Sequence, residues 1–143
     1  EVRRRAVVEA PPEIGDRLQL KGDNRVLARG FRLFADDEPV QVADFYLPYD
    51  LVKGTRVEDP ASEPWPGGTI AQLESLGIEV TEIAEDVAAR APRPEEVRDL
   101  RLGAGTPVFE VVRTMFADER PIATSSIIIA GDRYVLSYRI PLQ

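Results

Sequence analysis

The sequence contains one short pattern twice. FADDEPV begins at Phe34 and returns as FADERPI at Phe116, 82 residues further along (116 − 34). With this offset and without gaps, nine residues of segment 12–48 are identical to their counterparts in segment 94–130. Two unrelated segments of this length would share roughly two, since ordinary residue frequencies are about 5–7%. We therefore interpret residues 12–48 and 94–130 as duplicated units, which favours a fold with internal symmetry.

Each unit is predicted to be a helix followed by a β-hairpin. Pro94 suits the first position of a helix, and Glu95 and Glu96 follow where negative charge complements the helix dipole. Two β-rich runs joined by a short acidic turn then predict a hairpin. The expected hairpin strands are 26–35 with 39–47, and 108–117 with 121–129. Further strands are expected at 2–9, at 79–89 and at 134–140, which makes about seven.

These elements predict an α+β fold class, with a mainly antiparallel sheet and flanking helices. A length of 143 residues suits one domain. The two hairpins are expected to lie in one sheet, related by approximate twofold symmetry. Residues 48–68 separate the copies, and they are either a lid over a site or a surface linker. Thr69 is expected to cap the short helix that follows.

Two residue types are absent, which excludes several kinds of chemistry. The chain has no Cys and no His. Zinc sites use one of these residues in nearly every case, and Ser-His or Cys-His catalysis needs the His. We therefore expect no metal, no cofactor and no catalytic residue. Acid–base chemistry could come only from carboxylates, Lys, Tyr or Arg.

Charge and hydropathy set further limits. The formal net charge is −7 and the pI is near 4.7, whereas a nucleic-acid-binding surface is basic. The short run Arg3–Arg5 is interpreted as a solvated strand end. No apolar run approaches the roughly 18 residues of a membrane span, and no charged-then-apolar leader is present. We expect a cytoplasmic protein with no membrane partner. Because Glu1 is not preceded by a Met, we also expect a fragment of a longer protein.

Three stretches of the second half resemble a known family. They are GGTIAQLESLGIEVTE, PRPEEVRDLRLGAGTPVFEVVRT and ERPIATSSIIIAGDRYVLSY, and FYLP in the first half adds to them. Their order and spacing closely resemble the C-terminal effector-sensing domain, called UTRA, of GntR-superfamily regulators of the HutC type. The resemblance covers about residues 2–138.

The resemblance implies a chorismate-lyase-like fold, a homodimer and a small-molecule pocket. It also implies a winged-helix DNA-binding domain ahead of Glu1, whose affinity for DNA changes when the pocket is occupied. DNA would then be bound only through that missing domain.

The resemblance also implies where a ligand would bind. Members that bind phosphorylated amino sugars place two Arg, two Glu and a Tyr at positions that hold only apolar residues here. Those positions are Phe31, Leu33, Ala43, Ala123 and Ile129. Thr69 matches the family's Ser/Thr at a helix start, where it could hold an anion or simply cap the helix. Burying a phosphate without matched charge would cost several kcal/mol. We therefore expect an apolar effector with one anionic or polar end, and not a phosphosugar.

Strand alternation nominates the other side chains on the pocket side of the sheet. The positions that share this side are Arg29, Phe31, Leu33, Gln41, Phe45, Ser125 and Ile129. Arg29 could meet a carboxylate, and an exposed arginine at a strand end is the alternative that we favour. Arg113, the repeat counterpart of Phe31, could reach the ligand or pair with an acid at the sheet edge. Tyr134 and Tyr138 are expected to pack in the core.

Two other functions remain as alternatives. An enzyme of the chorismate-lyase kind would need an Arg pair with a carboxylic acid in the same cleft. Arg29, Arg113 and Glu110 are candidates, although alternation places Glu110 on the opposite strand face from Arg113. The other alternative is a dimerisation module that has lost its ligand, which a filled pocket would favour and an open cleft would oppose.

Overall fold

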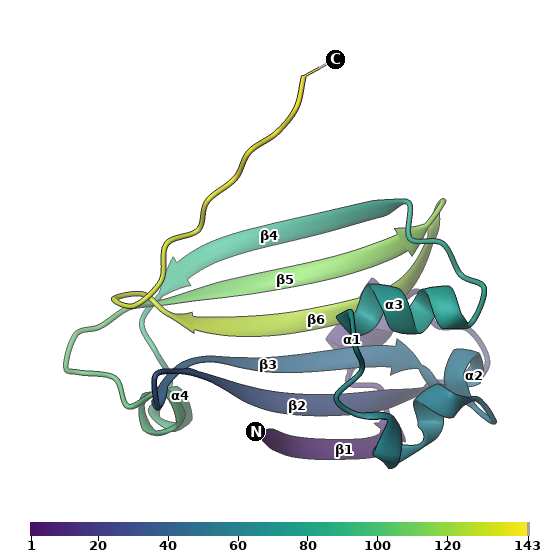
Figure 1. Cartoon of the computed structure of the whole chain (residues 1–143), viewed down its shortest axis with the longest axis horizontal. Helices are drawn as coiled ribbons and strands as arrows, with labels where there is room; N and C mark the ends of the chain where they lie inside the picture. Colours follow the sequence, from purple (N-terminus) through teal and green to yellow (C-terminus); the bar gives the residue numbers. More distant parts are fainter. Residues whose placement is uncertain (143) are drawn as a thin grey trace.

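The chain forms one six-stranded antiparallel sheet with the strand order β1-β2-β3-β6-β5-β4 (Figure 1). The structure is a computed structural model that describes residues 1–142. The strands are β1 (Val2–Glu9), β2 (Arg25–Ala35), β3 (Glu38–Pro48), β4 (Glu82–Arg90), β5 (Val108–Ala117) and β6 (Arg120–Ala130). The helices are α1 (Pro12–Arg17), α2 (Tyr49–Val52), α3 (Gly68–Ser75) and α4 (Pro94–Leu100), with 3-10 turns at Arg56–Glu58 and Pro60–Ser62. Within the described residues, no helix has the length and apolar character needed to cross a membrane.

The predicted α+β class and antiparallel sheet are confirmed, but the predicted strand at 134–140 is wrong. Those residues hydrogen-bond to no strand of the described chain, and the sheet has six strands. The segment runs away from the body past β4 (Figure 1). Tyr134 and Tyr138 are exposed, so the expectation that they pack in the core is also wrong. Apolar residues at alternate positions favour a strand, but a strand also needs a neighbour with free backbone groups.

The strand order is symmetric about the central pair β3 and β6. The order of elements α1-β2-β3 in the first half recurs as α4-β5-β6 in the second half. Both hairpins have a register shift one residue before the Phe of the repeated pattern, at Leu33/Phe34 and at Met115/Phe116. Asp36 and its counterpart Asp118 both adopt positive φ in the hairpin turn. These shared local features support the inference that segments 12–48 and 94–130 arose by duplication.

The two faces of the sheet are covered by different elements. On one face, α1 packs beside Val26, Ala28 and Tyr46, and α4 packs beside Val108 and Ala130. The other face is covered by α3 and by the connection that runs from β3 to α3, which cross in front of the sheet in Figure 1. Strand alternation separates the two sets, since consecutive side chains point to opposite faces.

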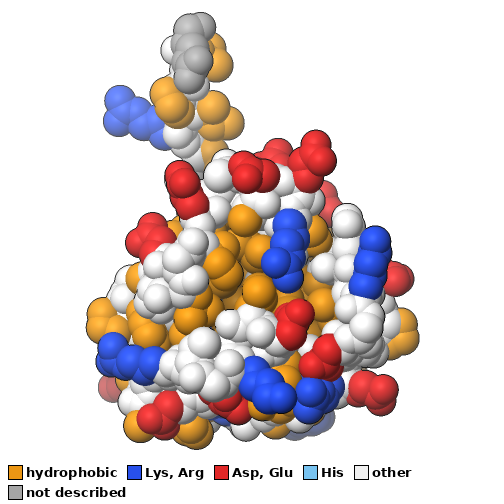
Figure 2. All heavy atoms as spheres, turned by 90° about the vertical axis from the view of Figure 1, so that its right-hand side faces the viewer, with side chains coloured by type: hydrophobic (Ala, Val, Ile, Leu, Met, Phe, Trp, Pro, Cys, Tyr) orange, Lys and Arg blue, Asp and Glu red, His pale blue; other side chains and the backbone are white. Residues whose placement is uncertain are grey.

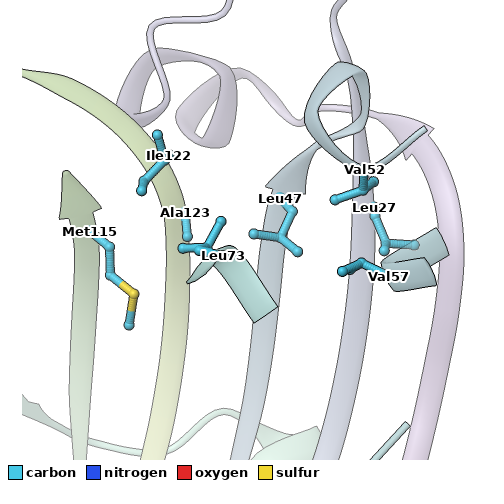
Figure 3. Close-up of a cluster of buried hydrophobic side chains, with 8 residues drawn as sticks. All are labelled: Leu27, Leu47, Val52, Val57, Leu73, Met115, Ile122 and Ala123. Carbon is cyan, nitrogen blue, oxygen red and sulfur yellow. The ribbon is translucent and has the colours of Figure 1, made fainter. Parts of the chain in front are cut away.

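The connection 49–67 is a folded cover and not a loose linker. Val52 and Val57 from this segment are fully buried against Leu27, Leu47 and Leu73 (Figure 3). Burying an aliphatic side chain of this size contributes about 1.5–3 kcal/mol. Arg5 on β1 adds hydrogen bonds from its guanidinium to the carbonyl oxygens of Val57 and Glu58. The segment between the two repeats therefore forms a lid over the sheet.

Candidate functional site

One row of side chains crosses all six strands on the face that the lid covers. The strand register places them side by side in the order Arg5, Arg29, Phe45, Ser125, Arg113 and Glu85. Because directly opposed residues of antiparallel strands point to the same face, this row brings three arginines to one side of the sheet. Arg29 and Arg113 are separated by three strand spacings, roughly 14 Å between their backbones.

A cleft of about 330 Å³ lies between this row and the lid. Its walls combine apolar and aromatic side chains with five polar ones, of which three are charged. From the sheet it is lined by Arg29, Phe31, Phe45, Arg113 and Met115. From the lid and α3 it is lined by Glu63, Pro64, Trp65, Gly67, Gly68, Thr69, Ile70 and Gln72. This size and this mixture are typical of small-molecule sites.

Two of the lining residues, Arg29 and Glu63, form a buried ion pair. Arg29 has a side-chain exposure of 4%, and its Nη1 donates to Glu63 Oε1 at 2.9 Å and to Gln72 Oε1 at 2.8 Å. The expectation of an exposed strand-end arginine is therefore wrong, because the lid covers this part of β2. Burial lowers the pKa of the Arg29 guanidinium, and the hydrogen bond to Glu63 works in the opposite direction. Nε and Nη2 of Arg29 are buried without a partner among the described residues.

Arg113 lies at the other side of the cleft and is held by a carboxylate of the edge strand. Its Nε donates to Glu85 Oε2 on β4, and both side chains are about one-third exposed or less. The residue thus pairs with an acid at the sheet edge, as considered from the sequence, and it also lines the cleft.

Thr69 lies at the start of α3 beside the cleft, but it does not cap that helix. The N-cap residue is Gly67, which has a left-handed backbone with φ of 87°, and Gly68 begins the helix. The capping role expected for Thr69 is therefore wrong. No side chain caps this helix start, and its first N–H, that of Gly68, donates to the carbonyl oxygen of Trp65 at 3.0 Å.

The structure divides the other predicted residues into three groups. Phe31 and Phe45 line the cleft and meet edge to face, with ring centroids 5.8 Å apart. Ala123 and Ser125 line a cavity of only about 10 Å³ next to Arg29. The residues that line neither space are Leu33, Gln41, Ala43 and Ile129, of which Ala43 and Ile129 are buried in a separate apolar cluster with Ile127 and Val111.

Several lining residues were not anticipated, and all of them except Met115 on β5 come from the lid or from α3. Glu63, Trp65 and Gln72 occupy a segment with no strand or long helix, so no periodicity assigns them to a face. Only the length of the connection indicated that it could take part in a site.

The acid considered for an enzyme lies away from the cleft. Glu110 accepts a hydrogen bond from Arg90 at 2.7 Å on the face that carries α4. Residues 1–142 contain no group of three His, Cys, Asp or Glu side chains that could hold a metal ion.

A second hollow, of about 460 Å³, lies at the end of the sheet beside the β5–β6 turn. Leu18, Asp50 and Arg120 are among its lining residues. Figure 2 faces this end of the molecule, where hydrophobic side chains gather at the centre and charged side chains surround them. The hollow contains none of the residues nominated from the sequence.

Known proteins share this architecture. Residues 1–135 match the family model of the UTRA domain. A transcriptional regulator assigned to the GntR family is 26% identical with a TM-score of 0.90, and all of this chain is covered. The chain spans 58% of the length of that regulator. No curated protein sequence matches the chain.

Two isolated domains have the same fold. The C-terminal domain of the histidine utilization repressor from Pseudomonas syringae pv. tomato is 22% identical, with a TM-score of 0.83 over 99% of this chain and 97% of that one. The ligand-binding domain of a GntR-family regulator from Bordetella bronchiseptica is 24% identical, with a TM-score of 0.79 over 100% of this chain and 90% of that one. The chain belongs to the UTRA family, the non-enzymatic effector-binding domains of GntR-family transcriptional regulators of the HutC type.

Proposed function

We propose that the cleft between the sheet and the lid is the effector site of a DNA-binding regulator. In this proposal a winged-helix domain ahead of Glu1 binds DNA, and occupancy of the cleft changes its affinity. The observation that carries the proposal is an open cleft of about 330 Å³ with a buried cation among its lining residues. A dimerisation module without a ligand would have no reason to keep such a space, since protein interiors are otherwise close-packed.

The effector that fits best is an apolar molecule with one anionic end. Phe31, Phe45, Trp65 and Ile70 offer apolar surface to the body of a ligand, and Arg29 offers a charge to its end. A phosphosugar fits poorly because a phosphate group carries close to two negative charges at neutral pH. Each cleft arginine is already balanced by a carboxylate of the chain. A ligand with one negative charge can replace one such carboxylate without changing the net charge of the site, whereas a dianion would leave a surplus negative charge.

The domain is also proposed to form a homodimer through its C-terminal segment, residues 134–142. Every second residue of this segment is apolar, namely Tyr134, Leu136, Tyr138, Ile140 and Leu142. Most of these side chains are exposed, and the segment protrudes from the body in Figure 2. The edge strand β4 exposes Ile83 and Val87 as well. A second copy would supply the strand partner that the segment lacks, and would remove both apolar surfaces from water.

Thermal denaturation with candidate ligands tests the effector site. An effector present at one hundred times its dissociation constant stabilises the folded state by about 2.7 kcal/mol. We expect a rise in melting temperature with aromatic or aliphatic carboxylates, and no rise with glucosamine 6-phosphate. Phe31→Ala should weaken the response. Leu33→Ala is the matched control, since Leu33 lies on the same face of the same strand but outside the cleft.

The possible results separate the alternatives. A specific response to glucosamine 6-phosphate would contradict the ligand class while leaving a sensor in place. If no class of ligand raises the melting temperature, or if Phe31→Ala and Leu33→Ala weaken the response equally, the effector site is contradicted and a dimerisation module is favoured.

A further inference from the structure

The ion pair in the cleft joins a fixed cation to an anion on the lid. Arg29 lies in the middle of β2, with strands paired on both sides through β1 and β3. Glu63 lies between the 3-10 turn Pro60–Ser62 and α3, outside any helix or strand. Besides the contact with Arg29, Glu63 Oε1 accepts a hydrogen bond from Gln72 Nε2 at 3.3 Å. A motion of the lid would therefore move the anion away from a stationary cation.

The contacts of Arg29 leave no free approach for a second anion. Its Nη1 is taken by Glu63 and Gln72, while Nε and Nη2 are enclosed. The cavity beside them, about 10 Å³, has room for no more than a single water molecule. An anionic group that enters the cleft can reach the guanidinium only where the Glu63 carboxylate now lies.

We propose that Glu63 occupies the place of the effector's carboxylate, and that the effector binds by displacing Glu63 from Arg29. This inference rests on the proposed function, because it concerns the same cleft. The exchange conserves charge: one carboxylate leaves the buried cation and another takes its place. Two carboxylates on one arginine would leave a surplus negative charge in a buried site, which is costly. Binding and release of Glu63 are therefore mutually coupled.

The exchange also explains which anions the site accepts and how the lid senses them. A ligand carboxylate can take the place of Glu63 at Nη1, where a hydrogen bond between two charged groups is stronger than one between neutral groups. A neutral ligand of the same shape cannot offset the loss of the Glu63 contact, so it leaves the lid in place. The lid thus responds to the charge of the ligand and not to its apolar body alone.

Trp65 provides a direct measure of this motion. It is the single tryptophan of the chain, it lies two residues after Glu63, and it lines the cleft. The guanidinium carbon of Arg56 lies 4.9 Å from the centre of its ring. Release of Glu63 should change the surroundings of this ring, and hence its fluorescence.

The test titrates benzoate and the neutral analogue benzamide into the wild-type chain, Glu63→Gln and Arg29→Gln, with calorimetry and Trp65 fluorescence as readouts. In Glu63→Gln the competing charge is gone, so we expect benzoate to bind about tenfold more tightly or better. The ligand-free fluorescence of Glu63→Gln should resemble that of benzoate-saturated wild type. Arg29→Gln should lose the preference for benzoate over benzamide. Glu63→Ala, which also removes the competing carboxylate, serves the same comparison if Glu63→Gln does not fold.

Each result decides a different point. If wild type binds benzoate through Arg29 but Glu63→Gln binds it no more tightly, Glu63 is only a structural partner; the displacement is then wrong and the effector site stands. If the Trp65 signal does not change when benzoate binds, the displacement is again wrong. If neither wild type nor Glu63→Gln binds benzoate, an Arg29 freed of its partner attracts no carboxylate, and the anionic effector site fails with the displacement.

Discussion

Arg29 and Glu63 are 34 residues apart in the chain and form an ion pair of 2.9 Å in which neither side chain is more than 9% exposed. One residue comes from the sheet and the other from the lid. The pair therefore ties the cover of the cleft to its floor, at the position where we propose that an effector acts.

The first prediction concerns the energy of this pair. Glu63→Met leaves a buried guanidinium without a counter-charge, and such a change costs about 3–5 kcal/mol. The double variant Arg29→Met/Glu63→Met removes both charges and should recover most of that loss. Chemical denaturation of the two single variants and the double variant measures the coupling. Arg3→Met, which breaks an exposed pair with Asp99, is the control and should cost less than about 1 kcal/mol. Additive losses in the double variant would show that the pair does not act as a unit.

The second prediction concerns pH and the start of α4. Glu96 accepts two hydrogen bonds from Arg90 and one from the backbone N–H of Arg93. The Arg90 guanidinium is the main cause that holds the pKa of Glu96 below its ordinary value of 4.5. The unfolded chain therefore takes up the proton first as pH falls.

The contribution of the ionised Glu96 carboxylate to stability is complete above its ordinary pKa, and it is lost as pH falls through the lower pKa of the folded state. Glu96→Gln lacks this contribution. We expect the difference in free energy of unfolding between wild type and Glu96→Gln to be largest near neutral pH and to shrink below pH 4.5. Urea denaturation across this range measures it, and a difference that is constant with pH would contradict the assignment.

The third prediction concerns the turn that begins α3. Gly67 and Gly68 both have positive φ, of 87° and 70°, which costs any other residue roughly 1–2 kcal/mol. A Cβ added at Gly67 would lie 2.8 Å from the Cβ of Ala71, whereas a Cβ at Gly68 would meet nothing within 4 Å. Gly67→Ala should therefore lower the melting temperature more than Gly68→Ala. Equal losses would mean that the helix start shifts freely to accommodate the clash.

The fourth prediction concerns the C-terminal segment 134–142. If this segment forms a strand that packs on a second copy, only one face of the strand lies against that copy. Tyr138 and Ile140 belong to this face. Tyr138→Glu should then shift the chain toward a monomer in light scattering after gel filtration. Ser137→Glu places the same charge on the other side of the strand, and it should leave the dimer intact. A monomeric wild type, or equal effects of the two substitutions, would contradict this mode of assembly.

The sequence was a good guide to elements whose pattern is local. The repeat, the acidic hairpin turns and the Pro-led helix of α4 predicted the antiparallel sheet. Alternation placed Arg29, Phe45 and Ser125 on one face, and the repeat pointed to Arg113 as the counterpart of Phe31. It misjudged the burial of Arg29, because burial depends on what covers a strand and the cover comes from another part of the chain. The segment 134–140 has the alternation of a strand, yet no strand of the described residues pairs with it.

By itself, then, the sequence determined the class of fold, the duplicated order of helix and hairpin, and the absence of His and Cys chemistry. These properties follow from composition and from the spacing of residue types within short stretches of the sequence. Only the tertiary structure decided that the connection between the copies is a lid and that Glu63 meets Arg29 across it. Such a contact depends on the path of an irregular segment, and that path is set by distant apolar anchors such as Val52 and Val57 and not by any local pattern.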